Sequence, residues 1–383
     1  MLFERKSMDV EIDLETLQEC FADLPDPRVV GRTAHRLQDI LFLTLCGVLC
    51  GMDDEEEIEE WGHGRLDWLR QFVPLENGIP SHDTITRVLS ALKPAKFQEC
   101  FVRWMKTLCP SLEGEIVALD GKTACGSRNT TNGVSAIHIV SAFSCGLGLT
   151  LGQVKTEAKS NEITALPLLI DMLDLQGATV TIDAMGCQKA LAEQLTGCGA
   201  HYVFGLKGNQ GNLHEAVQQL FARTEWQNYT EFDQMGHVTE DAGHGRKERR
   251  RYIALTCPDT APYKAWSGLQ SVIMVESMRQ MNDSVTVEKR YFVSSLPPDA
   301  EHLAKAIRSH WAIENRLHWC LDVTFGEDAC RNRTGHAPEN LNIVRKIAMN
   351  LLRLDPLKKT LPKKRVRASV NPQYLAQLIG VSV

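Results

Sequence analysis

Three acidic residues in this chain are spaced so that one fold could bring them together: Asp120, Asp183 and Glu314. Each aspartate directly follows a short apolar run, Ile116 to Leu119 in the first case and Ala178 to Ile182 in the second. A carboxylate at the tip of a buried strand is costly unless a partner pairs with it. Two aspartates and a glutamate form an oxygen-rich site that suits Mg²⁺. Paired ions at such a site stabilise the attacking and leaving oxygens of phosphoryl transfer, so the pattern predicts chemistry on a phosphodiester.

The segments around these residues have recognisable local patterns. Both apolar runs are short, rich in β-branched residues and bounded by turn signals, which predicts buried strands. Glu314 lies in a stretch from His310 to Trp319 that has helical periodicity. Taken singly, an aspartate after a strand commonly forms a turn, and a glutamate on an amphipathic helix is commonly solvated. The joint context favours a metal site, because both aspartates end apolar runs and Glu314 lies among aromatic residues.

Several blocks of the sequence resemble one family, the DDE insertion-sequence transposases, and within it the bacterial H-repeat-associated branch. The blocks are Leu119-Asp120-Gly121-Lys122, Ile182-Asp183-Ala184, Leu206-Lys207-Gly208-Asn209-Gln210, His310-Trp311-Ala312-Ile313-Glu314-Asn315, Leu317-His318-Trp319 and Leu321-Asp322-Val323. Two N-terminal blocks, Asp26-Pro27-Arg28 and Pro80-Ser81-His82-Asp83-Thr84, are similar to the helical domain associated with that family. The resemblance covers nearly the whole chain. It implies an RNase H-like catalytic core, a divalent metal, and cutting and joining of transposon-end DNA.

The match to the wider superfamily is incomplete around the glutamate. Many relatives carry a Tyr, an Arg and a Lys there, and the corresponding positions of this chain hold Ile307, His310 and Leu321. Positive charge could come instead from nearby arginines, namely Arg308, Arg316 or Arg331. The three DNA-positioning roles are therefore not transferred, whereas the three carboxylates are all present.

The order of predicted elements gives an α+β protein with a mixed-sheet, RNase H-like core. Residues 1–110 show helical periodicity and predict an all-helical N-terminal domain of the transposase-associated kind, with DNA binding as a possible role, in which Ser81 caps one helix. Residues 111–383 are expected to form the DDE catalytic domain, with Asp120 on its first strand and Asp183 on its fourth. The interval before Glu314 is too long for one helix and one strand. It predicts a β-rich insertion at about 211–295, and a basic segment follows at about 345–383.

Composition is that of an ordinary globular protein. The chain has 383 residues, 43% hydrophobic and 23% charged, which is long enough for two domains. Its longest apolar run is too short to span a bilayer and no signal peptide opens it, so a cytoplasmic location without membrane contact is expected. The twelve cysteines include no Cys-x-x-Cys pair, which favours reduced core thiols over a zinc site.

The net charge of −6 argues mildly against nucleic-acid binding, but the distribution of charge matters more. The acidic run Asp53 to Glu60 supplies much of the negative charge, whereas two other segments are locally basic. Beside a carboxylate site, basic residues favour phosphate contact. The candidate DNA contacts are Lys207, His244, Arg246, Arg308, Lys363, Lys364 and Arg365.

We therefore predict a DNA transposase that uses Mg²⁺ or Mn²⁺, with two ions held by Asp120, Asp183 and Glu314. Its partners are double-stranded DNA at the element ends and the target, and a second copy of the chain when assembled on DNA. Glu327 and Asp328 are rivals of Glu314 for the third ligand position. Trp311 and Trp319 are expected to pack the catalytic helix rather than to stack on a base. The alternatives are an RNase H-like endonuclease and a domesticated, non-mobile DNA-binding protein.

Overall fold

The chain divides into two compact units, which we describe separately. The computed structural model describes residues 12–29, 31, 33–128, 133, 135–157, 162–227, 236–243, 246–281 and 284–381. The first unit, called the helical unit, contains the N-terminal helices, strands β2 and β3, and everything described from Glu314 onward. The second unit, called the sheet unit, contains strand β1 as far as Asp120 and the elements between Glu162 and Ile313.

The helical unit is built mainly from helices at the two ends of the chain. Its elements are α1 (Leu14–Phe21), α2 (Leu37–Leu49), α3 (Glu55–His63), α4 (Leu66–Leu69), α5 (His82–Ala91), α6 (Pro94–Leu108), a short 3-10 helix (Cys125–Ser127), β2 (Ile137–Ser144), β3 (Leu149–Lys155), a π-helix (Glu314–His318), α12 (Trp319–Val323), α13 (Ala337–Leu354), α14 (Leu361–Val370) and α15 (Pro372–Leu378).

Helix α13 completes the core of the N-terminal helices. It packs on α2, α5 and α6, and α2 is apolar on nearly every side because it lies between other elements. The predicted cap of α5 is confirmed, since the Ser81 hydroxyl accepts a hydrogen bond from the backbone N–H of Thr84. Ile85, Val88 and Leu89 recur at helical spacing on α5 and are fully buried. Apolar periodicity therefore defined the buried face of this helix correctly.

Within the described residues, one mixed sheet of nine strands has the order β3-β2-β1-β4-β5-β9-β8-β7-β6. Strands β1 (Ile116–Ala124), β4 (Thr179–Ile182) and β5 (His201–Leu206) are parallel, and β2 pairs antiparallel with β3. The first five strands thus have the order 3-2-1-4-5. The prediction of an α+β protein with an RNase H-like mixed sheet and a helical N-terminal region is confirmed.

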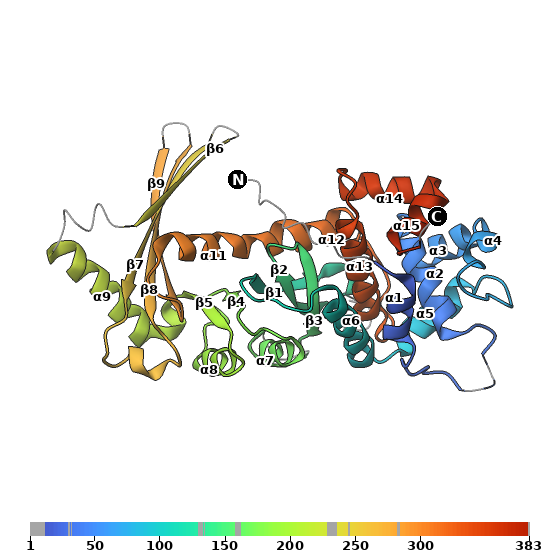
Figure 1. Ribbon diagram of the computed structural model, residues 1–383, viewed down its shortest axis with the longest axis horizontal. Helices are drawn as coiled ribbons and strands as arrows, with labels where there is room; N and C mark the ends of the chain where they lie inside the picture. Colours follow the sequence, from blue (N-terminus) through green and yellow to red (C-terminus); the bar gives the residue numbers. More distant parts are fainter. Residues whose placement is uncertain are drawn as a thin grey trace. The chain divides into compact units, whose positions relative to one another are not determined.

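Helices cover both faces of the sheet in the sheet unit. Helix α11 (Ala300–Ile313) packs across β4, β5, β6 and β7, on the side opposite α7 (Glu162–Met172) and α8 (Lys189–Gly197) in Figure 1. Helix α9 (Gly211–Gln227) packs on β9 (Ser284–Ser294). Short 3-10 helices also occur at Gly208–Gln210 and Tyr263–Ala265. Cover on both faces explains why all four residues of β4 are buried, including Thr179 and Thr181.

The segment between α9 and α11 extends the same sheet. It contributes β6 (His237–Gly243), β7 (Arg246–Thr256), β8 (Ser271–Met281) and β9, which pair antiparallel in sequence order. Strand β9 joins them to the core through antiparallel pairing with β5. The outer parts of these strands are long and exposed, as Figure 1 shows for β6 and β9. Among the described residues, none of the helices is both long and apolar enough to cross a membrane.

Candidate active site

Asp120 and Asp183 each follow the last paired residue of two neighbouring parallel strands. The register pairs Leu119 of β1 with Ile182 of β4, so each aspartate is the next residue along its strand. The preceding residues are buried on both strands, whereas both aspartates are half-buried. Strand β1 continues beyond Asp120 to Ala124, so this aspartate lies within a strand and not at its end. Carboxyl edges of parallel strands are where ligands bind in open α/β sheets.

The carboxylate of Asp183 also forms the turn after β4. Its Oδ1 accepts hydrogen bonds from the backbone N–H groups of Met185, at 2.9 Å, and Gly186, at 3.3 Å. A Cβ atom at Gly186 would lie 2.3 Å from Cγ2 of Ile182, so the turn is too tight for a side chain there. An ionised carboxylate has about four lone-pair sites. Turn formation at one oxygen therefore leaves this group capable of binding a cation.

Glu314 and His318 form a pair on the π-helix. The Glu314 side chain is 55% exposed, whereas His318 is buried, and Nδ1 of His318 lies 2.8 Å from Oε2 of Glu314. Burial lowers the pKa of His318, although the hydrogen bond to Glu314 acts in the opposite direction. The ring is therefore neutral near pH 7 and donates its Nδ1–H to the carboxylate. Single π-helical turns are frequent at functional sites.

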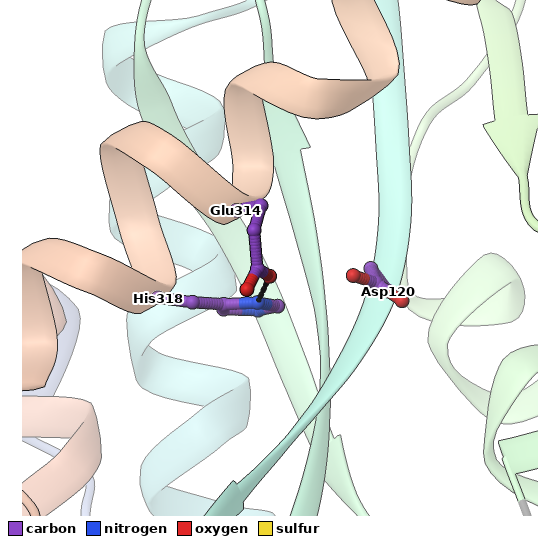
Figure 2. A group of neighbouring side chains, drawn as sticks. All are labelled: Asp120, Glu314 and His318. Atoms are coloured by element: carbon purple, nitrogen blue, oxygen red, sulfur yellow. Dashed lines mark hydrogen bonds and ion pairs between the residues drawn. The ribbon is translucent and has the colours of Figure 1, made fainter. Parts of the chain in front are cut away.

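One ligand atom from each of Asp120, Glu314 and His318 lies within 4.8 Å of the others, as Figure 2 shows. Asp183 is not part of this group. The two carboxylates are the oxygen ligands that Mg²⁺ and Mn²⁺ prefer. A histidine that donates to a ligating carboxylate is a common way to orient that ligand. The residues present therefore fit a divalent cation, with His318 fixing the position of Glu314.

His318 is a site residue that the sequence analysis missed. Its spacing of four residues from Glu314 is the available signal, because residues four apart share one side of a helix. The signal is weak alone, since the histidine could equally have packed in the core. The burial of its ring and its bond to Glu314 become visible only with the fold in place.

Two arginines hold the π-helix in the helical unit. Arg353 of α13 donates to the carbonyl of Arg316, within the π-helix, and to the carbonyl of Gly148 at 2.9 Å. Arg316 donates to the carbonyl of Cys145 at 2.8 Å. Both guanidinium groups lie over the ring of Phe143, 5.6 Å from its centre for Arg316 and 5.3 Å for Arg353. Irregular helical turns leave backbone carbonyls that need other donors, and these arginines supply them.

Replacing Gly148 with alanine is expected to disturb this arrangement. Gly148 has a φ of +75°, and an added Cβ would lie 2.0 Å from Nη2 of Arg316. We expect Gly148→Ala to lose about 2–4 kcal/mol of unfolding free energy, from backbone strain and displacement of Arg316. DNA cleavage should fall by about 10–100-fold, because misplacing a catalytic group by about 1 Å has an effect of that order. Urea unfolding and a cleavage assay measure the two effects.

Gly78→Ala is the matched control for Gly148→Ala. Gly78 has a nearly identical φ of +76°, and nothing lies within 4 Å of an added Cβ. The control should lose only the strain energy, about 1 kcal/mol, and should cleave DNA at the wild-type rate. If Gly148→Ala behaved like Gly78→Ala in both assays, the contact between Gly148 and Arg316 would have no role in holding the π-helix.

Glu327 and Asp328, the rivals of Glu314, are engaged elsewhere in the helical unit. Glu327 is buried, with Oε2 at 2.7 Å from Nζ of Lys122, and it also accepts from the amide of Asn342. Burial would raise the pKa of Glu327, but the positive charge of Lys122 outweighs it, so the pKa lies below its ordinary value. Asp328 accepts a hydrogen bond from the backbone N–H of Cys125 at 2.9 Å. These contacts support Glu314 as the third ligand.

Some of the candidate DNA contacts outside the C-terminal segment are exposed, and others form ion pairs with carboxylates of the protein. Lys207 follows β5 and is exposed. Arg308 of α11 forms an ion pair of 2.9 Å with Asp241 on β6. Arg246 forms an ion pair of 2.6 Å with the buried Glu248. His244 lies outside the described residues.

The three basic residues of α14 do not share one role. Lys363 is exposed. Lys364 is buried, donates to the carbonyl of Leu352 at 2.8 Å and pairs with Asp355 at 2.9 Å. Arg365 is also buried, and one of its ion pairs joins it to Asp53 at 2.6 Å. The cationic groups of Lys364 and Arg365 therefore bind protein oxygens in the interior, and we leave both residues out of the DNA contacts proposed below.

The arginines near Glu314 could supply the positive charge that relatives have at the positions of His310 and Leu321, and their surroundings differ. Arg316 points inward to the carbonyl of Cys145, and Arg308 pairs with Asp241. Arg331, in contrast, is exposed. His310 occupies one of the departing family positions, and its Nδ1 lies 3.0 Å from the hydroxyl of Thr181 on β4.

The expectation that Trp311 and Trp319 pack the catalytic helix is wrong. Their exposed fractions are 57% and 58%, on the two sides of Glu314 in sequence. Apolar periodicity did not reveal this, because an aromatic residue contributes to the pattern whether or not another element covers it. Exposed tryptophans close in sequence to the candidate ligand Glu314 offer flat apolar surfaces to a binding partner.

Comparison with known proteins places the chain in a well-defined group. Residues 111–351 match the family described as transposase DDE domain, and residues 18–105 match the family described as DDE_Tnp_1-associated. YncI of Escherichia coli O157:H7 is 42% identical over 96% of this chain and 95% of its own length. The H repeat-associated protein YhhI of Escherichia coli (strain K12) is 41% identical over 97% of this chain and 99% of its own. Both bear the name "putative transposase".

A solved structure is also similar, at a much lower level. The cryo-EM structure of a piggyBac transposase synaptic complex with hairpin DNA aligns with 98% of this chain and 79% of that chain. The TM-score is 0.45 and the sequence identity is 11%, which is too low to assign a fold.

Proposed function

Since this chain belongs to the transposase DDE domain family, we propose that it cuts the ends of a DNA element and joins them to a target. The observation that carries the proposal is the group formed by Asp120, Glu314 and His318 beside the strand that leads into Asp183 (Figure 2). Asp120, Asp183 and Glu314 would hold the divalent ions, two of Mg²⁺ or Mn²⁺, and His318 would orient Glu314. Such ions neutralise charge that develops on the phosphate and favour attack by water or a 3′-hydroxyl.

The side chains that would bind the phosphates of the DNA backbone are cationic and exposed to solvent. Lys207 follows the strand next to β4, and Arg331 follows the helix that carries Glu314. Lys363 is the exposed cation of the basic C-terminal segment. Arg246 and Arg308 already form ion pairs with Glu248 and Asp241. Each guanidinium group would therefore have to bind a phosphate and its carboxylate at the same time. Cutting and joining two element ends in one assembly calls for two active sites, and we propose that two copies of the chain assemble on DNA.

The exposed tryptophans support contact with unpaired bases at the cut end. Base stacking on an aromatic side chain contributes about 1–3 kcal/mol. We expect Trp319→Ala to weaken binding of an element-end duplex with frayed terminal bases by about 10–100-fold, with little change in stability because the ring is exposed. Fluorescence anisotropy with a labelled duplex measures this loss. Trp226→Ala is the matched control, since Trp226 on α9 is 84% exposed and lies on another helix. Equal affinity of the two variants would remove Trp319 from the DNA contacts.

The proposed function is tested by incubating the protein with a labelled duplex that contains the element end, in Mg²⁺, in Mn²⁺ and in EDTA. We expect cleavage at the element boundary with either metal and none in EDTA. A duplex that is bound and stays intact at every metal concentration would contradict the proposal.

A further inference from the structure

Lys122 lies at the centre of a cluster of carboxylates in the helical unit. Its side chain is 12% exposed, and its Nζ lies 2.7 Å from Oδ1 of Asp322, 2.7 Å from Oε2 of Glu327 and 3.7 Å from Oδ1 of Asp328. The attraction of these carboxylates outweighs the effect of burial and raises the pKa of Lys122 to about 12. The ammonium group is therefore charged near neutral pH and can pair with all three carboxylates.

The partners of Lys122 are fixed by further contacts. Glu327 is 3% exposed and accepts from Asn342 on α13. Asp328 accepts from the backbone N–H of Cys125 at 2.9 Å. A Cβ at Gly126 would lie 2.4–2.9 Å from the carbonyls of residues 327, 328 and 330, so the chain after β1 lies directly against this segment. Lys122 thus joins the end of β1 to a well-anchored part of the unit.

The sequence positions relate this cluster to the candidate active site. Lys122 follows Asp120 by two residues on one strand, and residues two apart in a strand point to the same face. Asp322 follows His318 by four residues and shares its side of the helix. The ion pair between Lys122 and Asp322 therefore joins the same two chain segments that bring Asp120 close to Glu314 and His318. Figure 2 shows the latter three side chains.

We propose that Lys122 is a positioning residue: its bridge to Asp322 and Glu327 sets the separation between Asp120 and the Glu314–His318 pair. This inference rests on the proposed function, because the distance between Asp120 and the Glu314–His318 pair matters only if these residues bind a divalent metal ion. It assigns a role to the lysine of the Asp120-Gly121-Lys122 block, which neither metal binding nor DNA contact uses. The ammonium group also offsets part of the negative charge of Asp322, Glu327 and Asp328.

Lys122→Met tests the proposal through metal affinity. Binding of Mn²⁺ is followed by the EPR signal of the free ion, for each variant with and without Asp120→Asn. The difference in Mn²⁺ binding between the two forms measures the binding that depends on Asp120. It excludes ions bound by the carboxylates that lose Lys122 as a partner. We expect this Asp120-dependent affinity to fall by about 10-fold or more, as for other residues that support metal ligands. Cleavage should need a correspondingly higher Mn²⁺ concentration, with recovery at saturation. Lys122→Arg, which keeps the charge, should recover part of the affinity.

A second variant separates positioning from loss of stability. Lys122→Met leaves Glu327 buried without its cation, which destabilises the fold by itself. Lys122→Met with Glu327→Met removes both charges, and replacement of a buried pair by apolar residues is often neutral for stability. The double variant should unfold in urea near the wild-type midpoint and still bind Asp120-dependent Mn²⁺ weakly. Wild-type Mn²⁺ affinity in this double variant would overturn the inference.

Lys364→Met is the matched control, since Lys364 is also a buried lysine with one close carboxylate partner, Asp355. It should lower stability and leave Asp120-dependent Mn²⁺ affinity unchanged. If Lys364→Met weakened the metal as much as Lys122→Met, the effect would reflect general loosening of the unit and the inference would fail. Failure of the proposed function is distinct, because the wild-type protein would then show no Mn²⁺ binding that Asp120→Asn removes.

Discussion

Asp120→Asn is expected to abolish cleavage and joining of element ends while leaving binding of the duplex near wild type. Asparagine keeps the shape of the side chain and removes the negative charge that a divalent ion requires. Loss of one electrostatic stabiliser of a transition state slows a reaction by about 10²–10³-fold. A larger loss is expected here, because the same change removes a ligand of the metal. Gel-based cleavage assays and anisotropy on the same duplex measure the two properties.

The control for Asp120→Asn is Asp174→Asn, at an exposed turn where the carboxylate accepts a hydrogen bond from Gln176 N–H. It should cleave DNA at the wild-type rate. An Asp120→Asn variant that cleaves as fast as Asp174→Asn would show that the site assigned here is not the catalytic one. A variant that no longer binds DNA would show that Asp120 acts in binding or in folding.

Glu314→Gln is expected to slow cleavage by about 10²–10³-fold. Glutamine can still accept the hydrogen bond from Nδ1 of His318, so the pair should keep its geometry and the protein its stability. The lost charge weakens the hold on one cation. Raising the Mn²⁺ concentration should therefore restore part of the rate, and a metal titration of strand cleavage measures this recovery.

Glu327→Gln is expected to act on stability instead. Glu327 is buried against Lys122, and breaking a buried ion pair by removing one partner costs about 3–5 kcal/mol. Asp328→Asn should have a small effect on both properties, because its side chain is 43% exposed and lies 3.7 Å from Lys122. Urea unfolding and cleavage across the metal titration are compared for the three variants. An active Glu314→Gln beside a folded but inactive Glu327→Gln or Asp328→Asn would move the third ligand to the turn after the helix.

The parts of the site that could be predicted are those set by local pattern. The short runs before Asp120 and Asp183, rich in β-branched residues and bounded by turn signals, favoured buried strands, and the RNase H-like order makes those strands neighbours. The register of Leu119 with Ile182 then places the two aspartates next to each other. The helix of Glu314 followed equally well from its periodicity, because a long apolar stripe identifies a helix independently of its partners.

The parts that could not be predicted depend on which partner each side chain meets. Lys364 and Arg365 belong to a basic run that is typical of a surface, and only the return of α14 onto the carbonyls of other helices buries them. Trp319 lies in an aromatic stretch and is nevertheless exposed. The spacing of His318 and Glu314 allows their contact, but it does not indicate that the His318 ring is buried or that this turn is π-helical. Long-range contacts decide all of these.

The readings that compete with a transposase are an RNase H-like endonuclease and a non-mobile DNA-binding protein. The three proteins differ in what happens to the 3′ end after binding. An endonuclease would release a hydrolysed end, and a binding protein would leave the duplex intact. Only a transposase would join the element end covalently to a second DNA.

The most direct measurement is therefore strand transfer of a labelled, pre-cut element end into a supercoiled plasmid in the presence of Mg²⁺. We expect the label to become covalently attached to the plasmid with the wild-type protein and not with Asp120→Asn. Label that stays on the short duplex or appears only as hydrolysis fragments, with a protein that binds the duplex tightly, would contradict the assignment as a transposase.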